Sequence, residues 1–251
     1  MAIVASDIVV YGSASMPDDD TPTAIGGAID QDVLIAFTDL SADDTIEIVS
    51  SAAGDTTQTV TVYGRNAAGE IVSEAIGPLT GTTFVGGATT FERILKIVMS
   101  ATAVGNVTIR DASADVAIAV IPIGALEIRR PFYNAAAESG SGSARAYYEK
   151  VFISNDHATL TLTEAVLSLT DGSGLISFAM ETTLDNSDNN GGGNRQTHAG
   201  GYTFDATPKN IVNSQNLTAL SAQGVWLKLT LAAGEAAANT SFTLTTTGQT
   251  V

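Results

Sequence analysis

The chain has 251 residues, with 27 Asp and Glu against 11 Lys and Arg, and a formal net charge of −16. This charge argues against nucleic-acid binding, which needs clustered Lys or Arg, and against an anionic membrane surface. The sequence contains no cysteine, two histidines and one tryptophan, so few side chains are available for catalysis or metal binding. Its length allows one large or two ordinary domains with proper cores.

Residues 1–32 predict an extended N-terminal arm. Asp7 to Tyr11 has the pattern of one strand, but residues 16–22 contain two prolines and three consecutive aspartates. Proline lacks a backbone donor and is confined to sheet edges, which favours an arm or loop over a sheet interior. Residues 1–10 lack the basic n-region of a signal peptide, and we therefore expect synthesis in the cytoplasm.

Residues 33–126 predict a first antiparallel β-sandwich. Short strand patterns separated by turns are typical of such sandwiches. A hairpin connector lies at residues 66–69. Residues 91–99 also fit a helical turn, although the alternation of Leu95, Ile97 and Met99 favours a strand. The expected strands are Val33 to Phe37, Thr45 to Val49, Thr57 to Arg65, Glu70 to Ile76, Ile94 to Met99, Val107 to Arg110 and Val116 to Ile123.

Residues 127–147 predict a connector between two domains. Up to Leu126 the chain has 16 acidic and 4 basic residues, a net charge of −12; from Glu127 it has 11 and 7, a net charge of −4. This change in charge coincides with the end of the regular strand pattern. The Gly- and Ser-rich residues 138–144 have the composition of a linker.

Residues 148–251 predict a second β-sandwich. The turn at 171–174 is a strong hairpin signal, and Val225, Leu227 and Leu229 alternate with polar or aromatic residues. The whole chain is thus expected to be all-β, with two antiparallel sandwiches of jelly-roll or immunoglobulin-like type and an N-terminal arm. The expected strands are Tyr148 to Ser154, Ala158 to Leu162, Ala165 to Leu169, Leu175 to Glu181, Val225 to Leu231 and Phe242 to Thr246.

Three residues invite a test for a catalytic triad, namely Ser154, Asp156 and His157. A triad needs its members on separate elements that converge in space, with the nucleophile on a strained turn. Here all three belong to one expected turn, so we interpret His157 as a turn histidine. We predict no catalytic residue, no cofactor and no enzyme activity.

Two acidic loops could in principle bind calcium, at residues 18–20 and 185–189. Calcium prefers several carboxylate and carbonyl oxygens from one tight loop. The second loop lacks the glycine and the closing glutamate of an EF-hand. Solvated acidic loops without metal are the expected state, and calcium binding is the alternative.

A sugar-cleaving or sugar-binding site is a further alternative. Glu149, Glu164 and Glu181 lie on or near expected strands and could form a carboxylate pair. Trp226 and Tyr202 are the aromatic residues whose replacement would test glycan binding. Trp226 lies on the opposite strand face from Val225, and we expect it to pack inside rather than to contact a sugar.

Several stretches resemble tailed-phage virion structural proteins. Tyr148 to Asn155, leading into 161–165, resembles a strand pair common in these proteins, and Gly224 to Gly234 looks like the closing strand and turn of the same module. The hairpin at 63–70 is similar to sandwich domains of phage head-decoration and tail proteins. The resemblance implies a structural role in the virion, in the head or in the tail.

Together these features predict a capsid cement or decoration protein, a homotrimer that bridges and stabilises major capsid subunits in the virion. Self-repelling acidic surfaces keep such a protein soluble alone, and edge strands or arms add contacts to neighbours. Removing the first thirty or so residues should then abolish particle binding and leave the sandwiches folded. Alternatives are a tail or neck protein, a glycan-binding virion protein in host adsorption, or a cellular surface-layer protein. The expected interface residues are Met16, Pro17, Asp18, Asp19, Asp20, Arg129, Arg130, Phe132 and Tyr133.

Overall fold

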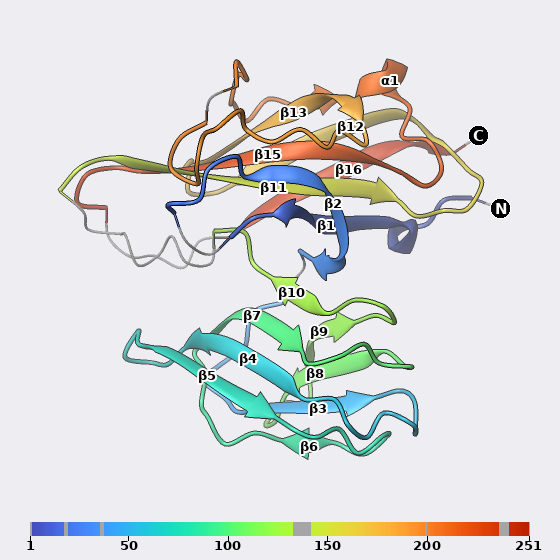
Figure 1. Cartoon of the computed structure of the whole chain (residues 1–251), viewed down its shortest axis with the longest axis vertical. Coiled ribbons are helices and arrows are strands. Elements are labelled where there is room, and N and C mark those ends of the chain that lie inside the picture. The colour runs from blue at the N-terminus through green and yellow to red at the C-terminus, as the bar shows by residue number, and fades with distance from the viewer. Residues whose placement is uncertain are drawn as a thin grey trace. The chain divides into compact units, whose positions relative to one another are not determined.

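The computed structural model describes residues 2–17, 20–35, 38–132, 142–198, 200–235 and 241–250. Strands make up nearly all of the regular structure in these ranges (Figure 1). Helical structure there is limited to the single turn Ala5–Asp7 and the four-residue helix α1, Val212–Gln215. The chain divides into unit 1, Met1–Asp30 with Asn134–Val251, and unit 2, Gln31–Tyr133. The all-β fold of antiparallel sheets is therefore confirmed.

Unit 1 contains two sheets. In the larger one, unit 1 contributes the strand order β13-β15-β11-β1-β2, and in the smaller one the order is β14-β12-β16. The longest pairing joins β11 to β15, from Arg145↔Leu231 to Asn155↔Ser221. The strands of unit 1 are β1 Ile8–Ser15, the start of β2 Gly26–Leu34, β11 Arg145–Asn155, β12 Leu162–Asp171, β13 Ile176–Leu184, β14 Lys209–Asn210, β15 Ser221–Leu231 and β16 Phe242–Thr250.

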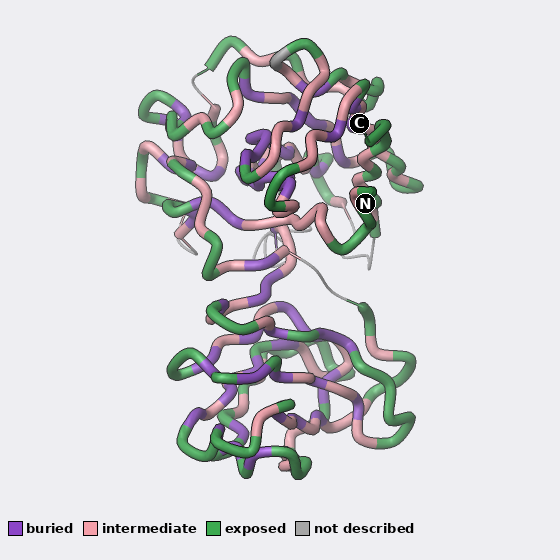
Figure 2. The backbone as a smooth tube through the Cα atoms, turned by 90° about the vertical axis from the view of Figure 1, so that its right-hand side faces the viewer, coloured by how far each residue is buried: buried purple, intermediate pink, exposed green. Residues whose placement is uncertain are grey.

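The central strands of unit 1 are buried on both faces. Seven of the eleven residues of β11 are buried without a break, from Glu149 to Asn155, and so are the first seven of β15. Figure 2 colours the backbone by burial and shows such buried runs beside exposed turns. Neighbouring residues of a strand point to opposite faces of the sheet. One face therefore carries Val151 and Val225, and the other carries Lys150 and Trp226. A polar residue on either face of these strands needs a partner inside the protein.

Unit 2 also contains two sheets. One has the order β10-β7-β4-β5, with the end of β2 parallel to β10 (Glu127↔Val33), and the other has the order β6-β3-β8-β9. Buried residues alternate along β3 and β8, as expected for strands with one core face. The strands are β3 Ile46–Ser50, β4 Val60–Arg65, β5 Ile71–Ile76, β6 Val85–Gly86, β7 Arg93–Met99, β8 Val107–Asp111, β9 Ala117–Ile121 and β10 Glu127–Arg129.

The expected N-terminal arm is wrong. Residues 8–12 of β1 pair antiparallel with β11, from Ile8↔Asn155 to Gly12↔Val151, and residues 26–34 form β2. The prolines at 17 and 22 interrupt the chain only between these two strands. The physical reason is that the strand expected at residues 7–11 finds a pairing partner in β11, which lies far away in the sequence and which local composition does not indicate.

The expected connector at 127–147 is also incorrect at both ends. Glu127–Arg129 form strand β10, in which Ile128 lies opposite Ile97 of β7, and Arg145 already begins β11. Residues 133–141 of the connector, which include the Gly- and Ser-rich stretch in part, lie outside the described residues. Elsewhere, β7 replaces the helical-turn alternative at 91–99, and residues 158–161 precede β12 rather than form a strand.

Candidate functional site

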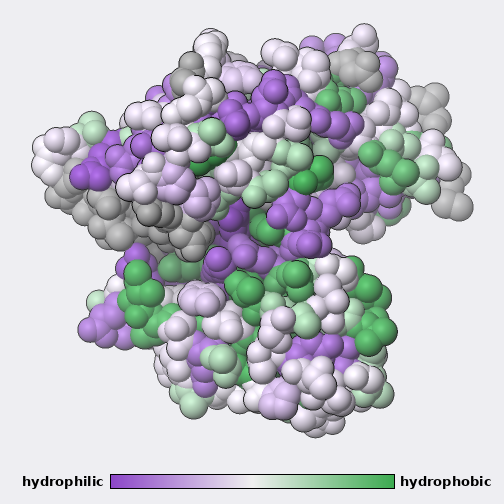
Figure 3. Space-filling model, in the orientation of Figure 1, coloured by the Kyte–Doolittle hydropathy of each residue, from purple (hydrophilic) through white to green (hydrophobic). Residues whose placement is uncertain are grey.

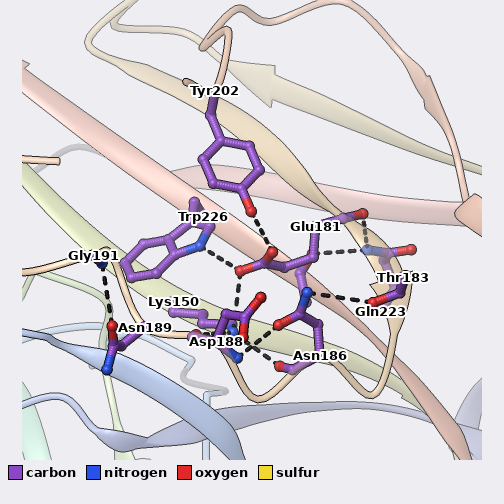
Figure 4. Close-up of polar contacts among 11 residues, drawn as sticks. Lys150, Glu181, Thr183, Asn186, Asp188, Asn189, Gly191, Tyr202, Gln223 and Trp226 are labelled. Carbon is purple, nitrogen blue, oxygen red and sulfur yellow. Dashed lines mark hydrogen bonds and ion pairs between the residues drawn. The ribbon is translucent and has the colours of Figure 1, made fainter. Parts of the chain in front are cut away.

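The most concentrated polar chemistry in unit 1 is a buried ion pair between Lys150 of β11 and Glu181 of β13. The Lys150 side chain is 0% exposed and that of Glu181 is 1% exposed, and their Nζ and Oε1 atoms are 3.1 Å apart. Lys150 Nζ also donates to the backbone carbonyls of Asn186 at 3.0 Å and Asp188 at 2.8 Å (Figure 4). Three acceptors thus match the three N–H groups of the ammonium.

The Glu181 carboxylate is held by two further donors. Trp226 Nε1 donates to Oε1 at 2.7 Å, and the Tyr202 hydroxyl donates to Oε2 (Figure 4). Burial, and then the hydrogen bond to Glu181, raise the pKa of Tyr202, which keeps its phenol a proton donor. Burial lowers the pKa of Lys150, and the charge of Glu181 acts against that shift. The network satisfies both charges inside the protein.

Aromatic side chains pack around this hydrogen-bond network. Trp226 is 1% exposed and packs with Met16 and Ile25, and the ring of His198 meets it edge-on with centroids 4.6 Å apart. Burial lowers the pKa of His198, which favours the neutral imidazole. The expectation that Trp226 packs inside is confirmed. A tryptophan with this exposure has no free face for stacking on a sugar ring. The other rings around His198 are Tyr148, Tyr202 and Phe204.

A second buried pair lies on the opposite face of β11. Arg195 donates to Glu149 Oε2 at 3.5 Å and to the Pro17 carbonyl at 2.9 Å, and both charged side chains are 1% exposed. Because Glu149 and Lys150 are neighbours in a regular strand, Glu149 and Glu181 lie on opposite faces of the sheet. These two carboxylates therefore cannot act together on one glycosidic bond, which requires them to flank it. Glu164 accepts a hydrogen bond from Gln249.

The acidic loop at 185–189 already has a cation at its carbonyls. Its Asn186 and Asp188 carbonyls bind Lys150, and the Asp185 carboxylate accepts the Ala222 amide at 2.8 Å. In the described part of the chain, no three His, Cys, Asp or Glu side chains group as metal ligands. Two carbonyls that a calcium ion could use in this loop, those of Asn186 and Asp188, thus already accept hydrogen bonds from the Lys150 ammonium.

His157 lies in a turn, as its position in the sequence indicated. Its Nδ1 accepts the amides of Thr159 at 3.1 Å and Leu160 at 3.0 Å. Ser154 Oγ donates to Asp156 at 2.5 Å, and Tyr11 donates to the other oxygen of that carboxylate at 2.6 Å. Because Nδ1 of His157 accepts these amides, it has no proton to donate to Asp156, as the histidine of a triad would do.

The expected interface residues of the first segment are largely inside unit 1. Met16 is 5% exposed, the Pro17 carbonyl binds Arg195, and Asp20 accepts a hydrogen bond from Gln196 at 2.8 Å. Asp18 and Asp19 lie outside the described residues. The prediction that Met16 contacts a partner is wrong, because its side chain forms part of the Trp226 cluster.

Of the expected interface residues of the second segment, Arg129 and Phe132 are buried in unit 2 and Arg130 is partly buried. Arg129 is 5% exposed, and its guanidinium lies 3.8 Å from Glu127. Arg130 donates to the Ile94 carbonyl at 2.6 Å and pairs with Asp39. Phe132 is 7% exposed. Tyr133 lies outside the described residues. Both arginines thus make contacts within unit 2, and their contact with a neighbouring subunit stays a prediction.

Sequence reasoning missed the central roles of Lys150, Glu181 and Arg195. A signal for one of them existed, since Lys150 stands beside Val151 and Phe152 in an expected strand, where a lysine is seldom buried unless it is paired. Arg195 carried no such signal because it lies in a Gly- and Asn-rich loop.

Comparison of the chain with protein-family models and with curated proteins finds no match. Two solved structures align with it at low similarity. An anti-sigma factor domain-containing protein from Clostridium clariflavum has 10% identity over 96% of this chain and 86% of its own, with a TM-score of 0.17. A T=1 particle derived from infectious bursal virus has 12% identity over 100% and 66%, with a TM-score of 0.15. These scores are too low to indicate a shared fold. No described helix is long and apolar enough to cross a membrane.

Proposed function

We propose that this chain is a virion structural protein, a cement or decoration protein that binds over major capsid subunits and stabilises the shell. The observation that carries the proposal is the burial of the ion pairs in unit 1. The two ion pairs, Lys150 with Glu181 and Arg195 with Glu149, have charged side chains that are at most 1% exposed and lie within unit 1. Buried pairs of this kind hold a fold together and present nothing to a substrate.

The surface supports the same role. On the face that Figure 3 shows, hydrophilic and neutral residues alternate with small apolar areas. With a net charge of −16 the free protein repels its copies at random contacts. A capsid lattice offers many equivalent sites, so weak contacts repeated across it can hold such a protein in place.

The glycan-binding alternative loses the residues on which it rested. Trp226 is buried, and the Tyr202 hydroxyl is engaged by Glu181. Exposed aromatic faces are what a sugar platform requires. We therefore favour a contact role over a carbohydrate site.

Quantitative mass spectrometry of purified particles of the encoding virus tests this proposal. We expect a copy number comparable to that of the major capsid protein, and added purified chain should restore heat resistance to particles made without it. A few copies per particle would move the protein to the tail or neck. Absence from particles, or identical heat resistance with and without the chain, would contradict a structural role in the shell.

A further inference from the structure

Strand β16 forms a long edge of the smaller sheet of unit 1, beside which the described residues place no further strand. It pairs with β12 on one side, from Asp171↔Phe242 to Leu162↔Thr250, and it is the last strand in the order β14-β12-β16. Its sequence, Phe-Thr-Leu-Thr-Thr-Thr-Gly-Gln-Thr, has no charged residue and no proline. Charged residues and proline are what proteins usually place on an edge strand to prevent pairing with another chain.

Two other sheet edges receive backbone hydrogen bonds from the protein's own chain. At β13, Phe178 and Asp205 exchange backbone hydrogen bonds of 3.0 and 3.3 Å. At β9, the Thr38 amide donates to the Ile118 carbonyl at 3.1 Å. Along β16, the described residues supply backbone pairing only from β12. The outward N–H and C=O groups of β16 thus form a template for another strand.

We propose that β16 pairs antiparallel with β16 of a second copy of this chain around a two-fold axis at Thr246. This register places Thr245 opposite Thr247 of the second copy, and Leu244 opposite its Gly248. Thr–Thr pairs across strands are favourable, and the neutral strand brings no like charges together in a chain of net charge −16. Both copies then use the same surface patch at the interface, as a closed two-fold dimer requires.

Two-fold pairing differs from the trimer that the sequence led us to expect. A three-fold ring would join β16 of one copy to a different edge of the next. The opposite edge of the same sheet is β14, Lys209–Asn210, which has only two residues. A two-fold axis instead uses the full nine residues of β16 twice.

Disulfide trapping tests the register, because the natural chain contains no cysteine. Residues directly opposite in an antiparallel pair have Cα atoms about 4.5–5.5 Å apart, within disulfide range. Thr246→Cys should therefore yield a covalent dimer on mild oxidation. Thr243→Cys is the matched control, since its two copies would be about 20 Å apart in this register. Equal cross-linking of the two variants, or none in either, would overturn the register.

Charge variants test the pairing in solution by sedimentation equilibrium. Wild-type protein should have twice the 25.7 kDa chain mass. Thr245→Glu with Thr247→Glu places like charges opposite each other at two positions and should weaken dimerisation about tenfold or more. Thr245→Lys with Thr247→Glu places opposite charges there and should restore it. Circular dichroism confirms that each variant is folded.

A wild-type monomer or trimer, or equal dissociation of both charge variants, would overturn the proposed pairing. These measurements use the purified full chain without particles. A negative result would therefore leave the decoration role open to its own test, and failure to bind particles would leave the dimer standing.

Discussion

The two units reach similar two-sheet architectures with different polar interiors. In unit 1, a loop at 185–189 covers the Lys150 face of the large sheet, and its carbonyls need donors, which the lysine supplies. In unit 2, Asp55 lies at the ends of strands and supplies acceptors instead. It receives hydrogen bonds from the Ser50 hydroxyl, the Gln58 amide and the backbone amides of Val104 and Gly105.

In each unit, the buried charge matches the backbone groups that a loop turns toward it. In unit 1, the loop at 185–189 turns two carbonyls toward the sheet, and the Lys150 ammonium satisfies both. In unit 2, the amides of Val104 and Gly105 point inward, and the Asp55 carboxylate satisfies both. Unit 1 therefore buries ion pairs within its sheet, whereas unit 2 buries the carboxylates of Asp55 and Asp111, which accept backbone amides from loops at the ends of strands.

The largest expected effect follows from deleting residues 1–30. This removes β1 and the start of β2, and with them the pairing of Ile8 to Gly12 with β11. We expect unit 1 to lose its fold, so Trp226, the only tryptophan, should show the fluorescence of an exposed indole. Unit 2 keeps its strands from β3 to β10, and far-UV circular dichroism should retain part of the β signal. A native Trp226 spectrum in the truncated chain would contradict the role of β1 as an integral strand.

The next largest effect concerns the buried pair of unit 1. Glu181→Gln or Lys150→Met leaves one buried charge uncompensated, and we expect each to cost about 3–5 kcal/mol in the free energy of unfolding of unit 1. The double variant should cost less than the sum of the two, because no isolated charge remains. Denaturant titration followed by Trp226 fluorescence measures these losses.

Lys228→Met is the matched control, a lysine of β15 that is only partly buried. Its replacement should change the free energy of unfolding of unit 1 by less than about 1 kcal/mol. A comparable loss in Lys228→Met and Lys150→Met would show that the buried pair has no special role.

A smaller effect is expected at Asp55 of unit 2. The Ser50 hydroxyl and the amides of Val104 and Gly105 lower the pKa of Asp55 in the folded state. A lowered folded pKa means that this stabilisation is present above the usual carboxyl range, about pH 4, and is lost as the pH falls through the folded pKa. Asp55→Asn should reduce the stability of unit 2 at neutral pH and flatten this acid dependence.

Amide hydrogen exchange at Val104 and Gly105 provides the measurement for Asp55, because both amides donate to that carboxylate. Exchange at these positions should accelerate in Asp55→Asn while amides in β11 are unchanged. Unaltered protection at both amides would refute the role assigned to Asp55.

The smallest effect is expected for the surface pair of Glu47 and Arg110. Their side chains are 26% and 20% exposed and their closest atoms are 2.6 Å apart. Glu47→Gln should cost about 0.2–1 kcal/mol, since Asp115 and the Phe84 ring still contact Arg110. Thermal unfolding at low and high salt tests this, and the difference between variant and wild type should shrink as salt is added.

The sequence by itself determined the class of fold and most of the strand positions. Alternation at Val60 and Val62, and again at Val225 and Leu227, marks one face of each strand, because side chains in a strand repeat every second residue. It also identified His157 as a turn residue and predicted that Trp226 packs inside. These conclusions depend on local geometry, which the order of residues specifies directly.

Only the tertiary structure decided which segments meet. Ile8 pairs with Asn155, and Lys150 meets Glu181 and the carbonyl of Asp188. The acidic, proline-containing turn after β1 suggested an arm because composition reports solvent preference and says nothing of pairing partners. A strand at β11 likewise implies two faces for its side chains but does not show what covers each. Whether a charged residue on such a strand meets water or an opposite charge is set by distant segments of the chain.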